Sequence, residues 1–142
     1  MSLEDCYERR QLRTSRPDPL KAKMSISTAE SHLTEAERLA KAGFRNVAVV
    51  VAYASMFHAG RALLFKDGVI EKSHYCLAVY LREKYVTGGK LSNELISVMD
   101  AFREERQDVM YGLETPELNK DDENAAIENA RKMIKEVKKL LV

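Results

Sequence analysis

The sequence predicts an all-α fold, an up-and-down bundle of four long helices and one shorter helix. Three observations lead to this class. Apolar residues recur at spacings of three and four along most of the chain, no run alternates apolar and polar residues as a half-buried strand would, and all three prolines lie outside the periodic segments. The periodic segments are joined by short connections, so we expect successive helices to pack antiparallel.

The first long helix is expected to follow the cap Asp18, with Pro19 in its first turn, and to end at Gly43. The second is expected over residues 46–67 and is apolar on nearly every side from Val47 to Phe57, which predicts the most buried helix. Along the first helix a narrow apolar stripe allows a neighbouring helix to approach closely; it comprises Ala22, Ile26, Ala29, Leu33, Ala36 and Ala40.

Three further helices complete the prediction. Ser73 is a candidate cap for a helix over residues 74–86, and Ser92 for a helix over residues 93–111. The last helix is expected to begin near Lys120 or Asp121, and its acids gather at the start and its lysines at the end, which suits the helix dipole. Its inward face is expected to comprise Ala126, Ala130, Met133, Val137 and Leu140.

The predicted domain organisation is an N-terminal arm over residues 1–16 and a single helical-bundle domain over residues 17–142. The arm has room for a short helix before the prolines at 17 and 19 and carries four arginines against three acids. Two interpretations of the arm stay open at this point. It is either an arm exposed to solvent or one that contacts phosphate or a partner.

Composition excludes several classes of protein. Apolar residues make up 45% and charged residues 32%, which is typical of a soluble globular domain, and the net charge of +1 means that nucleic-acid binding would need a local basic patch. Cys6 and Cys76 form no CxxC pair, which argues against a disulfide scaffold or structural zinc and favours a reducing cytoplasm. We see no secretory signal, and the longest apolar run, 47–54, is too short to span a bilayer.

One arginine breaks the apolar pattern of the helix predicted over residues 93–111. At 100° per residue, Arg106 lies near the centre of a face formed by Leu95, Val98, Met99, Phe102 and Val109. Because an unpaired guanidinium is costly to desolvate, Arg106 must meet an acid, water, a second subunit or an anionic ligand. An intramolecular ion pair and an anion or dimer-interface site both remain open. Tyr111 lies about 140° away on a regular helix, so it shares this face only if the last turn loosens before Gly112.

Histidines offer few further candidates. His58 and Arg61 are three residues apart and therefore neighbours on the buried helix, where His58 is expected to be a hydrogen-bonded core residue or to join the Arg106 site. His74 and His32 are expected at the surface. His74 and Cys76, two apart, cannot share a helical face, so no metal site is predicted, and no glycine-rich phosphate loop or catalytic triad points to a cofactor.

Three stretches resemble HEPN-domain proteins, and in particular a largely uncharacterised archaeal and bacterial branch: "AYASMFHAGRALLFKDG" (52–68), "KSHYCLAVYLREKYV" (72–86) and "REERQDVMYG" (103–112). Residues 16–44 are also similar to that branch. The resemblance implies a small helical bundle, a homodimer, and frequently a neighbouring minimal nucleotidyltransferase that restrains a ribonuclease toxin. Nuclease members carry an arginine followed after four to six residues by a histidine; Arg106 matches the arginine, but Tyr111 stands at the histidine's place.

We therefore expect a dimeric module that binds nucleotide or RNA phosphate and acts with a nucleotidyltransferase partner in a toxin–antitoxin-like system. The candidate binding residues are Arg103, Arg106, Gln107 and Tyr111, with His58 and Arg61 nearby. The alternatives are a metal-independent endoribonuclease toxin and a purely structural helical adaptor. A tyrosine is a poor general base near neutral pH, which favours binding over cleavage.

Overall fold

The computed structural model describes residues 1–114 and 116–142, and within them the chain is predominantly helical, as predicted. The four long helices begin and end within one or two residues of the expected positions. In chain order the elements are α1 (Leu3–Glu8), β1 (Leu12–Thr14), α2 (Pro19–Lys41), α3 (Arg45–Asp67), β2 (Val69–Glu71), α4 (His74–Leu81), the π-helical turn η1 (Arg82–Val86), α5 (Asn93–Tyr111) and α6 (Lys120–Leu140).

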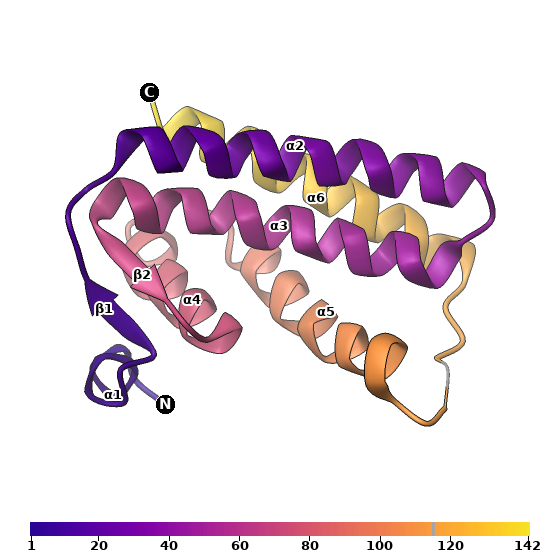
Figure 1. Ribbon diagram of the computed structural model, residues 1–142, viewed down its shortest axis with the longest axis horizontal. Helices are drawn as coiled ribbons and strands as arrows, with labels where there is room; N and C mark the ends of the chain where they lie inside the picture. Colours follow the sequence, from indigo (N-terminus) through magenta and orange to yellow (C-terminus); the bar gives the residue numbers. More distant parts are fainter. Residues whose placement is uncertain (115) are drawn as a thin grey trace.

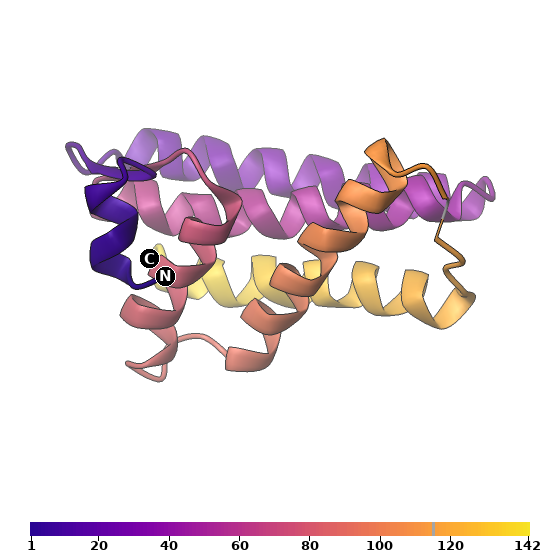
Figure 2. The ribbon, with the colours of Figure 1, turned by 90° about the horizontal axis from the view of Figure 1, so that it is seen from below.

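Helix α3 lies at the centre of the bundle (Figure 1). Helices α2 and α6 run alongside it, whereas α4 and α5 cover its other side. Figure 2 shows that α5 crosses the bundle obliquely, and that both chain termini lie at the same end as α1. The end of α5 and the start of α6 lie at the opposite end of the molecule's long axis.

The apolar sequence of α3 is explained by this central position. By length and composition the helix could cross a membrane, but 67% of its most apolar stretch is buried inside the bundle, as in the core helix of a soluble protein. Small residues let α2 pack closely on α3, and two serines bridge the helices: Ser25 Oγ donates to the carbonyl of His58 (2.8 Å) and Ser55 Oγ to that of Ala29 (2.7 Å).

The N-terminal arm is more ordered than the sequence indicated, because it contains a strand. Strand β1 pairs antiparallel with β2, with Leu12 opposite Glu71, so the expectation of a chain without strands is corrected. Three residues are too few to show an alternating pattern. At the turn before β2, Gly68 has φ +79°, and a Cβ there would lie 2.7 Å from the carbonyl oxygen of Ser15, so this position requires glycine.

The prediction from the cysteines was wrong. Cys6 of α1 and Cys76 of α4 form a disulfide, with Cα atoms 5.8 Å apart and both residues buried. Spacing along the chain could not reveal this pair, because 70 residues separate the two cysteines. The reducing compartment was inferred from two cysteines that form no CxxC pair, so a cytoplasmic location stays a prediction without that support.

The helix predicted over residues 74–86 changes its geometry at Arg82. The amide of Thr87 donates to the carbonyl of Arg82, a bond across five residues that characterises a π turn. This turn brings Tyr80 and Tyr85 onto one side, where both hydroxyls donate to Asp67 Oδ2, at 2.8 and 2.7 Å. Ser73 caps α4 as expected, whereas Ser92 precedes α5 without a side-chain capping bond.

Candidate anion-binding site

Arg106 lies where the apolar face of α5 leaves the core. Leu95 and Met99 of this face are buried, whereas Phe102 and Val109 are only half buried. The guanidinium carbon of Arg106 lies 5.9 Å from the centre of the Tyr53 ring on α3, a cation–π arrangement. Its Nε is buried, and in the described part of the chain it has no hydrogen-bond partner. Among these residues no carboxylate forms an ion pair with Arg106, so the intramolecular ion pair is not observed.

Arg103 lies one helical turn before Arg106 and repeats the same arrangement. Its guanidinium carbon is 5.8 Å from the centre of the Tyr75 ring on α4, and its Nε donates to Asp100 Oδ1 at 3.1 Å. Both arginine side chains are partly exposed. Residues three apart on a helix are surface neighbours, so two guanidinium groups lie side by side over rings from α3 and α4.

Arg103, Arg106, Tyr53 and Tyr75 are called the arginine–aromatic cluster below. His74 also lies in this cluster, contrary to the expectation that it is a surface residue. Its ring stacks on Phe57, with centroids 4.0 Å apart, and its Nδ1 lies 2.5 Å from the hydroxyl oxygen of Tyr53. Burial lowers the pKa of His74 to about 4, and the positive charges of Arg106 and Arg103 act in the same direction. His74 is therefore neutral at pH 7.

The hydrogen bond between Tyr53 and His74 bears on which nitrogen of His74 carries the proton. Burial raises the pKa of Tyr53 to about 12, although Arg106 and Arg103 oppose the rise, so its hydroxyl keeps its proton. A phenol is a stronger acid than a neutral imidazole, which favours the tautomer in which Tyr53 donates and Nδ1 accepts. The proton of neutral His74 then lies on Nε2, which is a donor and suits an anion rather than a substrate proton.

His58 and Arg61, the candidates on α3, have other partners. His58 stacks on His32 of α2, with centroids 5.3 Å apart, so both rings are half buried and His32 does not simply face solvent as expected. Burial lowers the pKa of His58, and His32 and Arg61 add to this effect. Arg61 Nε lies 2.8 Å from Glu71 Oε1, an ion pair that ties α3 to β2.

The remaining two candidates are not gathered around Arg106. Gln107 is exposed, and Tyr111 is 71% exposed at the last residue of α5. Helix α5 stays regular to Tyr111, so the loosened last turn that would have brought the ring back does not occur. Within the described residues, no hydrogen bond or ring contact joins either side chain to Arg106. Arg103 and Arg106 are thus the two candidates that the structure brings together.

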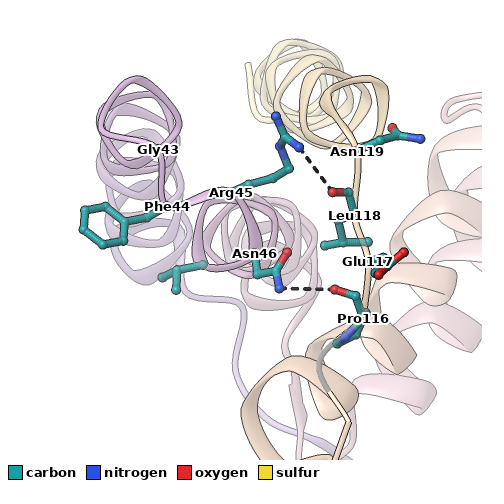
Figure 3. A pocket seen from close by; sticks show the side chains of 9 residues that line it. Gly43, Phe44, Arg45, Asn46, Pro116, Glu117, Leu118 and Asn119 are labelled. Carbon is teal, nitrogen blue, oxygen red and sulfur yellow. Dashed lines mark hydrogen bonds between the residues drawn. The ribbon is translucent and has the colours of Figure 1, made fainter.

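A separate hollow of about 770 Å³ lies at the far end of the bundle, between the start of α3 and the connection to α6 (Figure 3). Its donors already bind carbonyl oxygens of their own chain: Arg45 binds that of Leu118 at 3.4 Å and Asn46 that of Pro116 at 3.3 Å. None of the cluster residues lines it. Among the described residues, no group of three or more His, Cys, Asp or Glu side chains is placed to hold a metal ion.

The lowered pKa of His74 predicts a loss of stability in acid. An unfolded His74 binds a proton below about pH 6.5, whereas the folded residue remains neutral down to about pH 4, so acid favours unfolding across that window. After a discount for the half-exposed ring, we expect a loss of about 1–2 kcal/mol.

Denaturant unfolding of the wild type and of His74→Gln, at intervals from pH 7 to pH 4.5, measures this loss. The glutamine carbonyl can still accept from Tyr53 but does not titrate, so the variant is expected to have the flatter profile. Part of the slope remains because the pKa of His58 is also lowered. Parallel profiles would show that His74 is not the titrating group.

The cluster contains a half-buried guanidinium without an acidic partner in the described residues, a second guanidinium beside it and a neutral imidazole, a combination whose chemistry suits an anion. The comparison with known families gives the class of this helical domain. The family model of the HEPN domain matches residues 22–140, so the chain belongs to the HEPN domain family. This supports a helical module whose role relates to nucleotides or RNA. No curated protein matches the chain at a significant level.

Proposed function

We propose that this protein is a HEPN module that binds the phosphate groups of a nucleotide or RNA through Arg106 and Arg103. The observation that carries the proposal is the buried Nε of Arg106, which has no hydrogen-bond partner among the described residues. A buried guanidinium donor left unsatisfied costs free energy, and a phosphate oxygen removes that cost. Arg103 adds a second positive charge, and His74 adds a neutral donor within the same cluster.

Arg106→Ala is expected to weaken nucleotide binding about 10- to 100-fold, because a hydrogen bond to a charged group contributes about 1.5–3 kcal/mol. Isothermal titration with a nucleoside triphosphate measures the change. The matched control is Arg38→Ala, since Arg38 is an exposed arginine of α2 without an ion pair in the described residues. Equal affinity in wild type and Arg106→Ala would contradict the proposal, and no binding by the wild type would favour a structural adaptor.

Dimerisation is part of the proposal, and exposed apolar side chains support it. Met110 is 54% exposed and Tyr111 71% exposed at the end of α5, and Phe44 and Val47 are 59% and 43% exposed at the start of α3. Exposed apolar side chains that lie together on a surface mark an interaction site. Interfaces place residues of this kind at their centre.

Met110→Glu is expected to convert the dimer to a monomer, because it introduces a charge into the apolar contact. Light scattering after size exclusion would then give a mass near the 16.2 kDa of one chain, against twice that for the wild type. Met24→Glu is the control, since Met24 is 59% exposed on α2, away from this end. A wild type that is monomeric at high protein concentration would overturn the dimer.

The partner and the biological role rest on the family resemblance. A minimal nucleotidyltransferase is the proposed partner, in a toxin–antitoxin-like pair, and co-expression followed by co-purification tests it. The geometry favours binding over RNA cleavage, because in the tautomer that Tyr53 favours as donor, Nδ1 of His74 accepts and Nε2 carries the proton. Degradation of cellular RNA on induction of the wild type, absent with Arg106→Ala, would establish the ribonuclease alternative instead.

A further inference from the structure

The arginines of the N-terminal arm lie on a segment that several contacts hold in place, but the arginines themselves form no ion pair in the described residues. The arm is fixed by the disulfide of Cys6, by the pairing of β1 with β2 and by Leu12, which is 1% exposed. Backbone bonds strengthen this attachment: the amide of Ser15 donates to Gly68 at 2.7 Å and that of Lys72 to Gln11 at 2.8 Å. All of these contacts use backbone or apolar groups. They leave four arginines exposed and without an ion pair in the described residues: Arg9, Arg10, Arg13 and Arg16.

Charge is strongly separated along the molecule, although the chain as a whole carries only +1. Residues 9–24 contain six basic side chains and one acidic side chain, and lie at the end of the bundle that holds β1 and the start of α2. Residues 104–123 contain eight acidic and two basic side chains, and lie largely at the opposite end. A polyanion is therefore attracted to one end and repelled from the other.

Two acidic side chains near the basic end, Glu4 and Glu8 of α1, are exposed, whereas four others are engaged in internal contacts. Asp18 accepts from the amide of Lys21 at the start of α2, and Asp5 accepts from the amide of Ser2 in the capping box of α1. Asp67 accepts from two tyrosines, and Glu71 is buried against Arg61. The four exposed arginines of the arm outnumber these two exposed acids, so the surface keeps an excess of positive charge.

The basic arm is connected to the arginine–aromatic cluster through the junction of β2 and α4. Lys72 is exposed and is bonded through its backbone to Gln11 of the arm, while His74, two residues further on, lies in the cluster with Tyr53. A strand whose phosphate occupied Arg106 would be repelled by the acids at the end of α5 and would run toward the arm. Along the chain, Lys72 stands between the strand that pairs with the arm and the histidine of the cluster.

We propose that a single strand of RNA binds along this path, with one phosphate at Arg106 and Arg103 and the following phosphates at Lys72 and the arginines of the arm. This inference rests on the proposed function, which it extends from a single phosphate site to a polynucleotide surface. A single strand bends easily from a half-buried guanidinium to an exposed edge strand, whereas a stiff duplex does not.

The test compares three probes on the full chain: uridine monophosphate, a uridine 4-mer and a uridine 12-mer. The variant Arg9→Gln/Arg13→Gln/Arg16→Gln removes three charges from the arm. A control variant, Lys41→Gln/Lys132→Gln/Lys135→Gln, removes three exposed charges from α2 and α6 that have no ion pair in the described residues. Both variants lower the net charge equally, so any difference between them reflects position.

Wild-type affinity is expected to rise from the 4-mer to the 12-mer. The arm variant is expected to bind the 12-mer at least about tenfold more weakly at low salt, and its plot of log affinity against log salt concentration should be shallower by about 2, since each phosphate contact on a single strand contributes about 0.7. Its affinity for uridine monophosphate should match the wild type, and the control variant should bind the 12-mer with a small, uniform loss.

Several results would overturn this inference. If the arm variant and the control variant lose affinity equally, or if a 12-base-pair duplex binds as tightly as the 12-mer, no single-strand path exists. If monophosphate binding depends on Arg106 but affinity does not increase with length, the path is wrong while the proposed function stands. If none of the three probes binds, the single-strand path and the proposed function both fail. If the arm variant alters only self-association in sedimentation experiments, the basic surface contacts another copy of the chain.

Discussion

Replacing both cysteines by serine is expected to lower the free energy of unfolding by about 4 kcal/mol. The disulfide between Cys6 and Cys76 closes a loop with a sequence separation of 70 residues. In the chain-entropy account, a cross-link of this length removes about 4 kcal/mol of conformational freedom from the unfolded chain. Because such a loss is a large fraction of the stability of a small domain, the disulfide is expected to dominate the attachment of the arm.

Denaturant unfolding of wild type and Cys6→Ser/Cys76→Ser, each with and without a reducing agent, measures this contribution. Reduction should destabilise the wild type and leave the double variant unchanged. Hydrogen exchange adds a local measure, since the amides of α1 and β1 should lose protection before those of α3. A thiol assay that detects two free cysteines in unfolded, unreduced wild-type protein, with no effect of reduction on stability, would contradict the prediction.

The disulfide also bears on the arginine–aromatic cluster. Cys76 lies in the first turn of α4, and its amide donates to Ser73 Oγ at 3.2 Å, so the bond fixes the turn that presents His74. Loss of the disulfide is therefore expected to weaken nucleotide binding modestly as well as stability. This second effect would not follow if the arm were attached independently of the site.

The long helices could be predicted because each carries its own signals. Asp18 and Pro19 start α2, Gly68 ends α3, and the acidic start and basic end of α6 match its dipole. The short strands, the disulfide and the π turn depend on contacts between distant residues. The turn at Arg82–Val86, for example, places Tyr80 and Tyr85 on Asp67, which no local pattern indicates.

The site also combines a feature that local sequence signals predict with features that depend on contacts between distant residues. Helical phasing alone placed Arg106 within an apolar face, and the structure shows it there. The rings that surround it come from α3 and α4, and their positions depend on the oblique crossing of α5, which hydrophobic periodicity does not determine. Tyr53, Tyr75 and His74 could have been suspected only from their presence in the stretches that resemble the family.

Arg61→Met is expected to lower the free energy of unfolding by about 3 kcal/mol at pH 7. The change leaves the Glu71 carboxylate, whose side chain is 5% exposed, without its ion-pair partner. The other oxygen, Oε2, is already buried and unpartnered in the described part of the chain. Removing one member of a buried pair typically costs 3–5 kcal/mol, and the partial exposure of Arg61 places the expectation at the lower end. Arg38→Met, at an exposed position of α2, is the control.

The dependence on pH identifies the cause of this loss. Burial raises the pKa of Glu71, and Arg61 opposes the rise, so removing Arg61 raises it further. A carboxyl group with a raised pKa in the folded state takes up a proton on folding, which stabilises the protein below the unfolded pKa of about 4.5. That stabilisation disappears as the pH rises through the folded pKa. The deficit of Arg61→Met should therefore shrink as the pH falls from 7 toward 4.5.

The double variant Arg61→Met/Glu71→Gln decides whether Arg61 is a structural or a binding residue. It removes both charges, so most of the lost stability should return, and a stable protein without Arg61 can then be titrated with nucleotide. Because Arg61 is paired with Glu71 across α3 and β2, the double variant is expected to bind as tightly as the wild type. A loss comparable to that of Arg106→Ala would instead place Arg61 at the phosphate, and its pairing with Glu71 would then have to break on binding.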